Sequence, residues 1–411
     1  MYANDGSGRC GGIAIAALKL AVLIRAAGDV LLYAYLPIYL YAHLGEERLW
    51  VIGLLPAVPG AARFVAAPFW GRQADRLARQ RPFLVGGLAA YAALMLLLPR
   101  VTASLQAVAL VAAASAFTCA FNPVARVWWT LRAPGRAVLD LAGWYRAEAA
   151  GFLGGSALLG WAAGSGAAAL AAWMWSMGAL FAAAAVWVAW AVPDAPRREG
   201  WGGGGSGGGP RGSSRAGSRI AGRGPAPSPM RAAAPVLGFV LLASLTWEAV
   251  AATYGVYVTQ ELGVPAPLYG LTIGASTAVN LWAYGPLAAA AERRGGGPLF
   301  LWSALGYAAM YLLMATRSPW AASLAYLVPM SAVLRTATNA WLAARVPEGA
   351  RGRASGLLDA AEACAAMLGA FLGGVAAHRL GLAFVPRAAL AGSLPLLLIL
   401  AWARVRGRRA L

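Results

Sequence analysis

Three ionisable side chains inside long apolar stretches of this sequence are of types that handle protons or bind polar solutes. Arg25 and Asp29 are four positions apart in the first stretch, so a helix places them on one face, where they can pair. Glu248, in a stretch of the second half, has no basic residue within one turn. Ionisable groups in such surroundings are costly unless they are paired or hydrated, which makes them candidates for function. For both acids, the alternative is a structural ion pair.

Five other polar side chains in these stretches complete the candidate set for proton coupling or substrate binding. Tyr35 and Tyr254 follow the two acids at the same acid-x5-Tyr spacing. Arg126 and Arg335 occupy similar places in the two halves, where each binds an anionic group or neutralises an acid; Arg126 alternatively snorkels to the membrane surface. The amide of Asn280 needs a partner in an apolar setting, so it should face a cavity or another helix.

The sequence lacks the residue patterns of an enzyme or a metalloprotein. Its three cysteines, at positions 10, 119 and 364, form no CxxC pair, and its two histidines are far apart. It contains no nucleophile elbow, P-loop or HExxH motif. We therefore expect no enzymatic activity, no cofactor and no bound metal.

The composition indicates that lipid surrounds these candidate residues. Hydrophobic residues make up 60% of the 411 residues and charged residues only 12%, about half the charged share of a typical soluble domain. The net charge of +19 is compatible with nucleic-acid binding. However, the arginines lie mostly between apolar stretches, which favours topogenic charge that flanks membrane helices. We expect a multi-pass membrane protein that binds no nucleic acid.

The apolar stretches predict twelve transmembrane helices, because a bilayer core needs about 20 apolar residues per crossing. The predicted spans are 14–41, 49–70, 83–100, 103–130, 142–166, 169–192, 234–261, 268–290, 298–316, 320–343, 355–377 and 383–403. Residues 197–232 are rich in Gly, Ser, Pro and Arg, a composition that cannot bury a core. The predicted domains are a six-helix bundle at 1–193, a disordered cytoplasmic linker at 194–233 and a second six-helix bundle at 234–411.

The arginines between the spans predict the orientation of the chain. The stretches after even-numbered spans carry 22 arginines and those after odd-numbered spans carry 5. Basic loops stay on the cytoplasmic side. We therefore expect both termini and the linker in the cytoplasm of a bacterial cell, with the helices in its cytoplasmic membrane.

The two halves repeat each other in sequence. Asp29 and Glu248 are 219 positions apart, as are Tyr35 and Tyr254, and Tyr91 and Tyr307 are 216 apart. Acids and tyrosines that match at nearly one offset are harder to obtain by chance than alanines or leucines. The repeat predicts an all-α fold of two pseudo-symmetric six-helix bundles, with substrate held between them near the midplane.

The loop expected between the second and third spans carries a recognisable motif. It reads Gly71-Arg-Gln-Ala-Asp75-Arg76-Leu-Ala-Arg79-Gln-Arg81, which is more specific than a charged hairpin requires. The motif resembles the GxxxDRxxRxR loop of the major facilitator superfamily (MFS). The resemblance implies two bundles that work by alternating access. It also implies a cytoplasmic latch of Gly71, Asp75, Arg76 and Arg79 that faces the eleventh span; alternatively, these charges only set topology.

Departures from the family pattern bear on the class of solute. Ala78 replaces the usual glycine of the motif, and the fifth span lacks the Gly-Pro pair of many drug antiporters. The resemblance therefore leans towards nucleoside and oligosaccharide symporters. We expect a monomeric, proton-coupled secondary transporter of a small solute. Two alternatives remain for the solute: efflux of an amphipathic compound, or uptake of a sugar-like or nucleoside-like metabolite. The alternative function is a membrane receptor or scaffold that kept the fold and lost transport.

Overall fold

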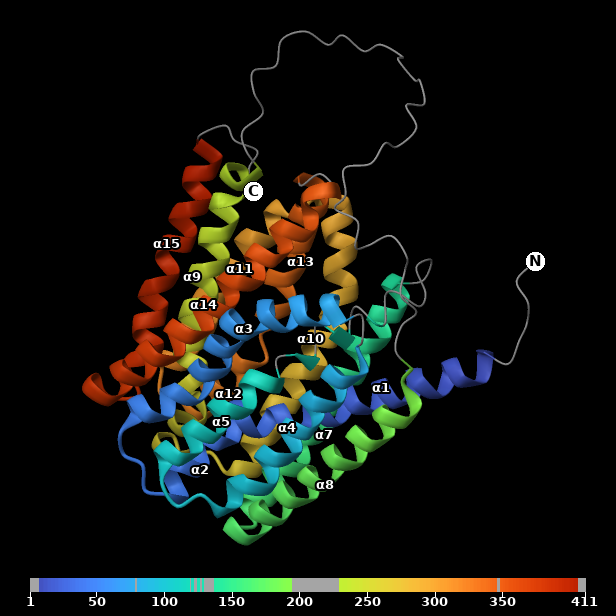
Figure 1. The fold of residues 1–411 in the computed structure, drawn as a ribbon. Coiled ribbons are helices and arrows are strands. Elements are labelled where there is room, and N and C mark those ends of the chain that lie inside the picture. The colour runs from blue at the N-terminus through green and yellow to red at the C-terminus, as the bar shows by residue number, and fades with distance from the viewer. Residues whose placement is uncertain are drawn as a thin grey trace, which may run out of the picture.

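The computed structural model describes residues 7–77, 80–118, 120–121, 124–125, 128, 137–193, 229–345 and 348–405, and these residues form helices and short connections without a strand. The first-half helices, coloured blue to green in Figure 1, are α1 (Ser7–Val30), η1 (Leu31–Tyr35), α2 (Leu36–His43), α3 (Leu49–Leu77), α4 (Arg81–Leu97), η2 (Leu98–Arg100), α5 (Ser104–Thr118), α7 (Ala137–Gly164) and α8 (Ala167–Ala191). The second-half helices, yellow to red, are α9 (Pro229–Val256), η3 (Tyr257–Glu261), α10 (Ala266–Arg294), α11 (Gly297–Ala315), α12 (Pro319–Tyr326), α13 (Met330–Arg345), α14 (Glu348–Leu380) and α15 (Phe384–Val405).

Long apolar helices make this an integral membrane fold. Among the described residues, seven helices are long and apolar enough to cross a bilayer: Leu49–Ala66, Arg81–Arg100, Ala167–Ala191, Pro235–Glu261, Gly297–Ala315, Ala360–Leu380 and Phe384–Trp402. The multi-pass, all-α character is confirmed, while the count of twelve crossings stays a prediction. The linker predicted at 194–233 lies mostly outside the described residues, and α9 begins at Pro229 within that range.

Several helices extend beyond the predicted membrane spans. Helix α3 continues to Leu77, so Gly71–Leu77 is helical where a loop was expected. Helix α10 likewise runs to Arg294, and α14 begins at Glu348. The expectation of a loop over Gly71–Leu77 was wrong, because loss of apolarity marks the membrane surface. It does not end a helix, since Gln, Ala, Arg and Leu are all good helix formers.

Glycine contacts repeat between the halves and reveal the pseudo-symmetry. In the first half α7 packs on α1, and a Cβ at Gly155 would lie 2.6 Å from the Cα of Ala27. In the second half α14 packs on α9, and a Cβ at Gly373 would lie 2.6 Å from the Cα of Ala249. Small residues at such crossings let helix backbones approach closely. Each bundle is therefore built around the same tight crossing of its first and fifth membrane stretches.

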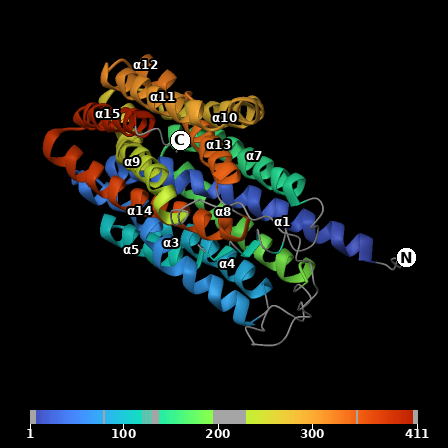
Figure 2. The ribbon, with the colours of Figure 1, turned by 90° about the horizontal axis from the view of Figure 1, so that it is seen from above.

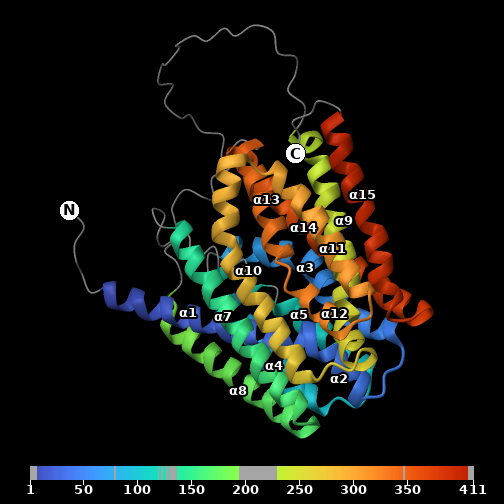
Figure 3. The same cartoon turned by 180° about the vertical axis from the view of Figure 1, so that it is seen from behind.

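The two halves meet along two further glycine contacts. Helix α3 lies against α14, where a Cβ at Gly53 would lie 2.9 Å from the Cα of Gly374 (Figure 2). Helix α7 lies against α10, where a Cβ at Gly160 would lie 3.1 Å from the Cα of Gly270 (Figure 3). Each half thus contributes one helix to each seam, as a two-fold arrangement requires.

Candidate functional site

A buried ionic cluster lies inside the first half. The guanidinium of Arg25 on α1 donates hydrogen bonds to the carboxylate of Asp29 on the same helix and to that of Glu148 on α7. The hydroxyl of Tyr91 on α4 donates to the other oxygen of Asp29 at 2.7 Å. Arg25 is 4% exposed and Asp29 is 9% exposed. These four residues are the first-half cluster, and it contains the Arg25–Asp29 contact that the four-residue spacing predicted.

Glu148 is the member of this cluster that the sequence analysis missed. It follows Arg146 near the start of the fifth span, where a charged residue is ordinarily assigned to the membrane surface. Its side chain is 31% exposed, compared with 12% for the side chain of Asp29. The cluster therefore holds two carboxylates and one guanidinium, and its more accessible carboxylate belongs to Glu148.

Three charged side chains of the second half interact electrostatically with one buried tyrosine. Glu248 on α9, Glu362 on α14 and Arg335 on α13 all lie within electrostatic range of the hydroxyl of Tyr307 on α11. These four residues are the second-half cluster. The ring of Tyr307 stacks beside that of Tyr311 at 5.9 Å between centroids. Here too, two carboxylates accompany one guanidinium.

The two clusters are related by the internal repeat, but not residue for residue. In each half the acids come from the first and fifth membrane stretches and the tyrosine from the third. The glycine contacts relate Ala27 to Ala249, an offset of 222 positions, whereas Asp29 and Glu248 are 219 apart. Glu248 therefore lies almost one helical turn before the position equivalent to Asp29. This shift puts the two acids in different surroundings.

Tyr35 and Tyr254, which the repeat pairs, make different contacts. The hydroxyl of Tyr35 crosses to the second half and donates to the carbonyl of Ala266 on α10 at 3.1 Å. In return, the hydroxyl of Tyr269 on α10 donates to the carbonyl of Ala34 at 3.4 Å. The hydroxyl of Tyr254 instead donates to a carbonyl of α12 in its own half at 2.9 Å. Tyr35 thus joins the halves, and Tyr254 stabilises one of them.

Asn280 supports the start of helix α13. Its side-chain oxygen accepts hydrogen bonds from the hydroxyl of Ser331 at 2.8 Å and from the backbone N–H of Ala332 at 3.2 Å. Its amide nitrogen donates to the carbonyl of Ser276 at 2.9 Å. The first N–H groups of a helix have no partner within the helix, and here an amide from another helix supplies one. Asn280 therefore faces a neighbouring helix, one of the two surroundings predicted for it.

The remaining predicted site residues fall where side chains are not described. Arg79 and Arg126 lie outside the described residues. Gly71, Asp75 and Arg76 lie on the last turns of α3, and the description covers only their backbone. The predicted cytoplasmic latch therefore stays a prediction.

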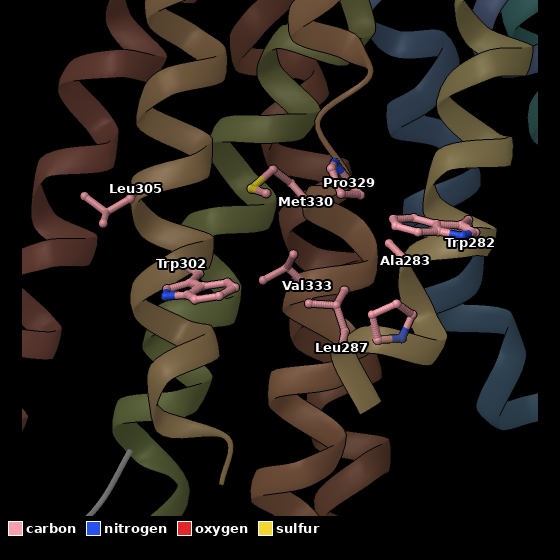
Figure 4. A pocket seen from close by; sticks show the side chains of 9 residues that line it. Trp282, Ala283, Leu287, Trp302, Leu305, Pro329, Met330 and Val333 are labelled. Atoms are coloured by element: carbon pink, nitrogen blue, oxygen red, sulfur yellow. The ribbon is translucent and has the colours of Figure 1, made fainter. Parts of the chain in front are cut away.

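An apolar pocket of about 450 Å³ lies between α10, α11 and α13 (Figure 4). Trp282, Trp302, Leu305, Met330 and Val333 are among its lining residues. Members of the second-half cluster lie two positions beyond Leu305 on α11 and beyond Val333 on α13, which is about 200° around each helix. The pocket and the cluster therefore lie on opposite sides of α11 and α13.

Comparisons with known proteins agree with this architecture. The family model of the Major Facilitator Superfamily matches residues 18–235 and 236–410. The structure of a mutant of the nucleoside transporter NupG matches with a TM-score of 0.76 and 13% identity, covering 94% of this chain and 99% of that one. A bacterial homologue of the human lysosomal transporter Spinster, inward-facing and occupied, matches with a TM-score of 0.74 and 13% identity, covering 98% of both chains.

A POT family transporter in complex with 5-aminolevulinic acid matches with a TM-score of 0.71 and 12% identity, covering 94% of this chain and 95% of that one. No curated protein matches this chain by sequence. At these identities the structural matches establish the fold, and the family model covers nearly the whole length of the chain. The chain therefore belongs to the major facilitator superfamily, as the motif at Gly71–Arg81 indicated.

Proposed function

We propose that this protein is a proton-coupled secondary transporter that moves a small solute by alternating access, as a monomer in a bacterial cytoplasmic membrane. The observation that carries the proton coupling is the contact of Arg25 with both Asp29 and Glu148. With both carboxylates ionised, the first-half cluster has a net charge of −1 in surroundings where uncompensated charge is costly. Binding one proton makes the cluster neutral, and releasing that proton restores the charge.

Within the first-half cluster, Glu148 is the better candidate for carrying the proton. Asp29 accepts hydrogen bonds from both Arg25 and Tyr91, and these bonds hold its carboxylate in place. Glu148 is more exposed, so water reaches it more readily. Asp29 then keeps Arg25 in place while Glu148 exchanges its proton. Glu248 in the second half remains a candidate for either protons or substrate.

The contacts between the halves support a state that is closed on the external side. The Gly160–Gly270 contact lies near the C-terminal end of α7 and the N-terminal end of α10, and the Tyr35–Ala266 hydrogen bond reaches the first residue of α10. In the orientation that the arginines predict, those ends face outwards. Opening to the outside then requires these contacts to separate while the close-packed bundles rock as rigid units.

Proton-driven uptake into proteoliposomes tests this function. Purified protein is reconstituted, a pH gradient is imposed and a panel of radiolabelled solutes is screened for flux. Glu148→Gln should abolish gradient-driven accumulation but retain solute exchange at equal concentrations, because only the proton site is lost. Glu261→Gln is the matched control, since Glu261, the last residue of η3, pairs with the exposed side chain of Arg317 at 2.8 Å.

Two outcomes decide against the proposal. Gradient-driven accumulation that persists in Glu148→Gln would remove the assigned proton site. Ligand binding without flux, in protein shown to be correctly reconstituted, would favour the receptor alternative.

A further inference from the structure

We infer that the second-half cluster is a binding site for the cationic amine of the solute, with Glu248 as the charge partner and the rings of Trp247 and Tyr326 beside it. The role of this site in transport rests on the proposed function. Binding of the amine does not depend on transport, and it can be measured without a proton gradient.

Glu248 lies where α9 packs tightly on α14. A Cβ at Gly369 of α14 would lie 2.4 Å from the carbonyl oxygen of Leu245 and 3.1 Å from the Cβ of Glu248, so the glycine permits this close crossing. Glu248 is half-buried, and its neighbour Trp247 is also half-buried. A mid-helix acid with this accessibility, inside a bundle, is placed to meet a solute that enters between the halves.

Two aromatic residues accompany this acid, its sequence neighbour Trp247 and Tyr326 of α12. The ring of Trp247 lies 5.4 Å from that of half-buried Tyr326, and Glu248 lies within electrostatic range of the Tyr326 hydroxyl. Tyr326 in turn stacks on Tyr254 at 4.7 Å between centroids, with 20° between the ring planes. The hydroxyl of Tyr254 is held by a carbonyl of α12, so this stack fixes the orientation of Tyr326.

The charges of the second-half cluster select a cation. Glu248 and Glu362 contribute two negative charges, and Arg335 contributes one positive charge. The faces of tyrosine and tryptophan rings attract cations in addition. An ammonium group gains from both the carboxylate and the rings, whereas an anion meets net repulsion and a neutral hydroxyl gains little from either.

The first-half cluster is not suited to the same task. Arg25 and Asp29 are almost wholly buried. The first-half cluster therefore exchanges protons, and the second-half cluster binds the amine of the solute.

Three probes of one shape and different charge test this inference. Phenethylamine, 2-phenylethanol and 3-phenylpropionate are titrated into purified full-length protein at pH 7, and binding is followed by isothermal titration calorimetry. We expect phenethylamine to bind about tenfold more tightly than the neutral alcohol, and 3-phenylpropionate not to bind. Equal affinity for the amine and the alcohol, or preferred binding of the acid, would overturn the inference.

Variants assign the binding to this cluster. Glu248→Gln should weaken phenethylamine binding about tenfold, to the level of the alcohol. Tyr326→Leu should also weaken it, and Arg335→Gln should strengthen it by removing the competing positive charge. Glu261→Gln should leave it unchanged. If Glu248→Gln elutes as aggregate in size-exclusion chromatography, the opposite effects of Tyr326→Leu and Arg335→Gln still decide; unchanged affinity in both would contradict the assignment.

The two hypotheses fail separately. Charge-selective amine binding without proton-driven flux would retain this site and reject the transport function. Proton-driven flux of a solute without any preference for phenethylamine over 2-phenylethanol would retain the transport function and reject this site.

Discussion

The guanidinium of Arg25 contacts the carboxylates of both Asp29 and Glu148, which are 119 positions apart in the chain and come together where α1 packs on α7. A single cation thus holds two anions in the interior of one bundle. Removing any one of the three charges changes the balance in a direction that can be predicted. The same count of two acids and one arginine recurs in the second half around Tyr307.

Replacing Arg25 should destabilise the protein more than any other change in this cluster. Arg25→Gln leaves two carboxylates in the bundle without their shared cation, a loss of about 3–5 kcal/mol for a buried pair. Thermal unfolding followed by intrinsic tryptophan fluorescence measures the effect. The double variant Arg25→Gln/Asp29→Asn should recover much of the loss. Failure of the second substitution to restore any stability would show that the arginine acts through packing and not through charge.

Tyr91→Phe should weaken the first-half cluster without changing its charge. The substitution removes the 2.7 Å hydrogen bond to the buried carboxylate of Asp29, at a cost of about 1–3 kcal/mol for a bond to a charged group. Tyr307→Phe in the second half is the matched comparison. A drop in melting temperature for Tyr91→Phe supports the assignment, and an unaltered melting temperature would contradict it.

Two adjacent glycines should respond differently to the same substitution. A Cβ at Gly155 would press on the backbone of Ala27, whereas a Cβ at Gly154 would have nothing within 4 Å. Gly155→Ala should therefore cost about 1–3 kcal/mol from overpacking, and Gly154→Ala should be neutral or slightly stabilising because alanine favours a helix. Comparable melting temperatures for the two variants would show that α7 and α1 are not packed this tightly.

Breaking the Tyr35 contact should favour the outward-open state. Tyr35→Phe removes a hydrogen bond between the halves, which is worth about 0.5–1.5 kcal/mol and shifts the population by roughly 2-fold to 12-fold. Double electron–electron resonance between spin labels on the external ends of the two halves reports that population. Tyr254→Phe loses a hydrogen bond within one half and should not shift it. Equal shifts in both variants would rule out a specific role for the Tyr35 contact.

Glu46, in the connection between α2 and α3, gives a pH dependence of stability. Hydrogen bonds from the side chain and backbone N–H of Arg48, at 2.8–3.0 Å, lower the pKa of the Glu46 carboxyl below its ordinary value. A lowered pKa in the folded state stabilises the protein above the unfolded pKa, and this contribution is lost as the pH falls through the folded value. The melting temperature of Glu46→Gln should therefore lie below that of wild type near pH 6, and the difference should shrink as the pH falls through the lowered pKa of Glu46. A constant difference across this range would assign the effect to packing.

Features that depend on local pattern could be predicted from the amino-acid sequence. Apolar stretches predicted membrane helices, the four-residue spacing predicted the Arg25–Asp29 contact, and the Gly71–Arg81 motif predicted the superfamily. These properties are local because burial in lipid needs only a run of apolar side chains, and residues one turn apart on a helix always share a face.

Only the tertiary structure decided which residues come together from different helices. It placed Glu148 on Arg25 and brought Glu248, Glu362 and Arg335 within electrostatic range of Tyr307. It also showed that Tyr35 bonds to the opposite half whereas Tyr254 bonds within its own half, although the repeat pairs them. The reason is the register of the helices at their close crossings. On the first helix of each half, Ala27 and Ala249 are equivalent and 222 positions apart. On the fifth helix, Gly155 and Gly373 are equivalent and 218 positions apart. A run of apolar residues is equally apolar in every register, so it does not encode which turn of one helix meets which turn of the next.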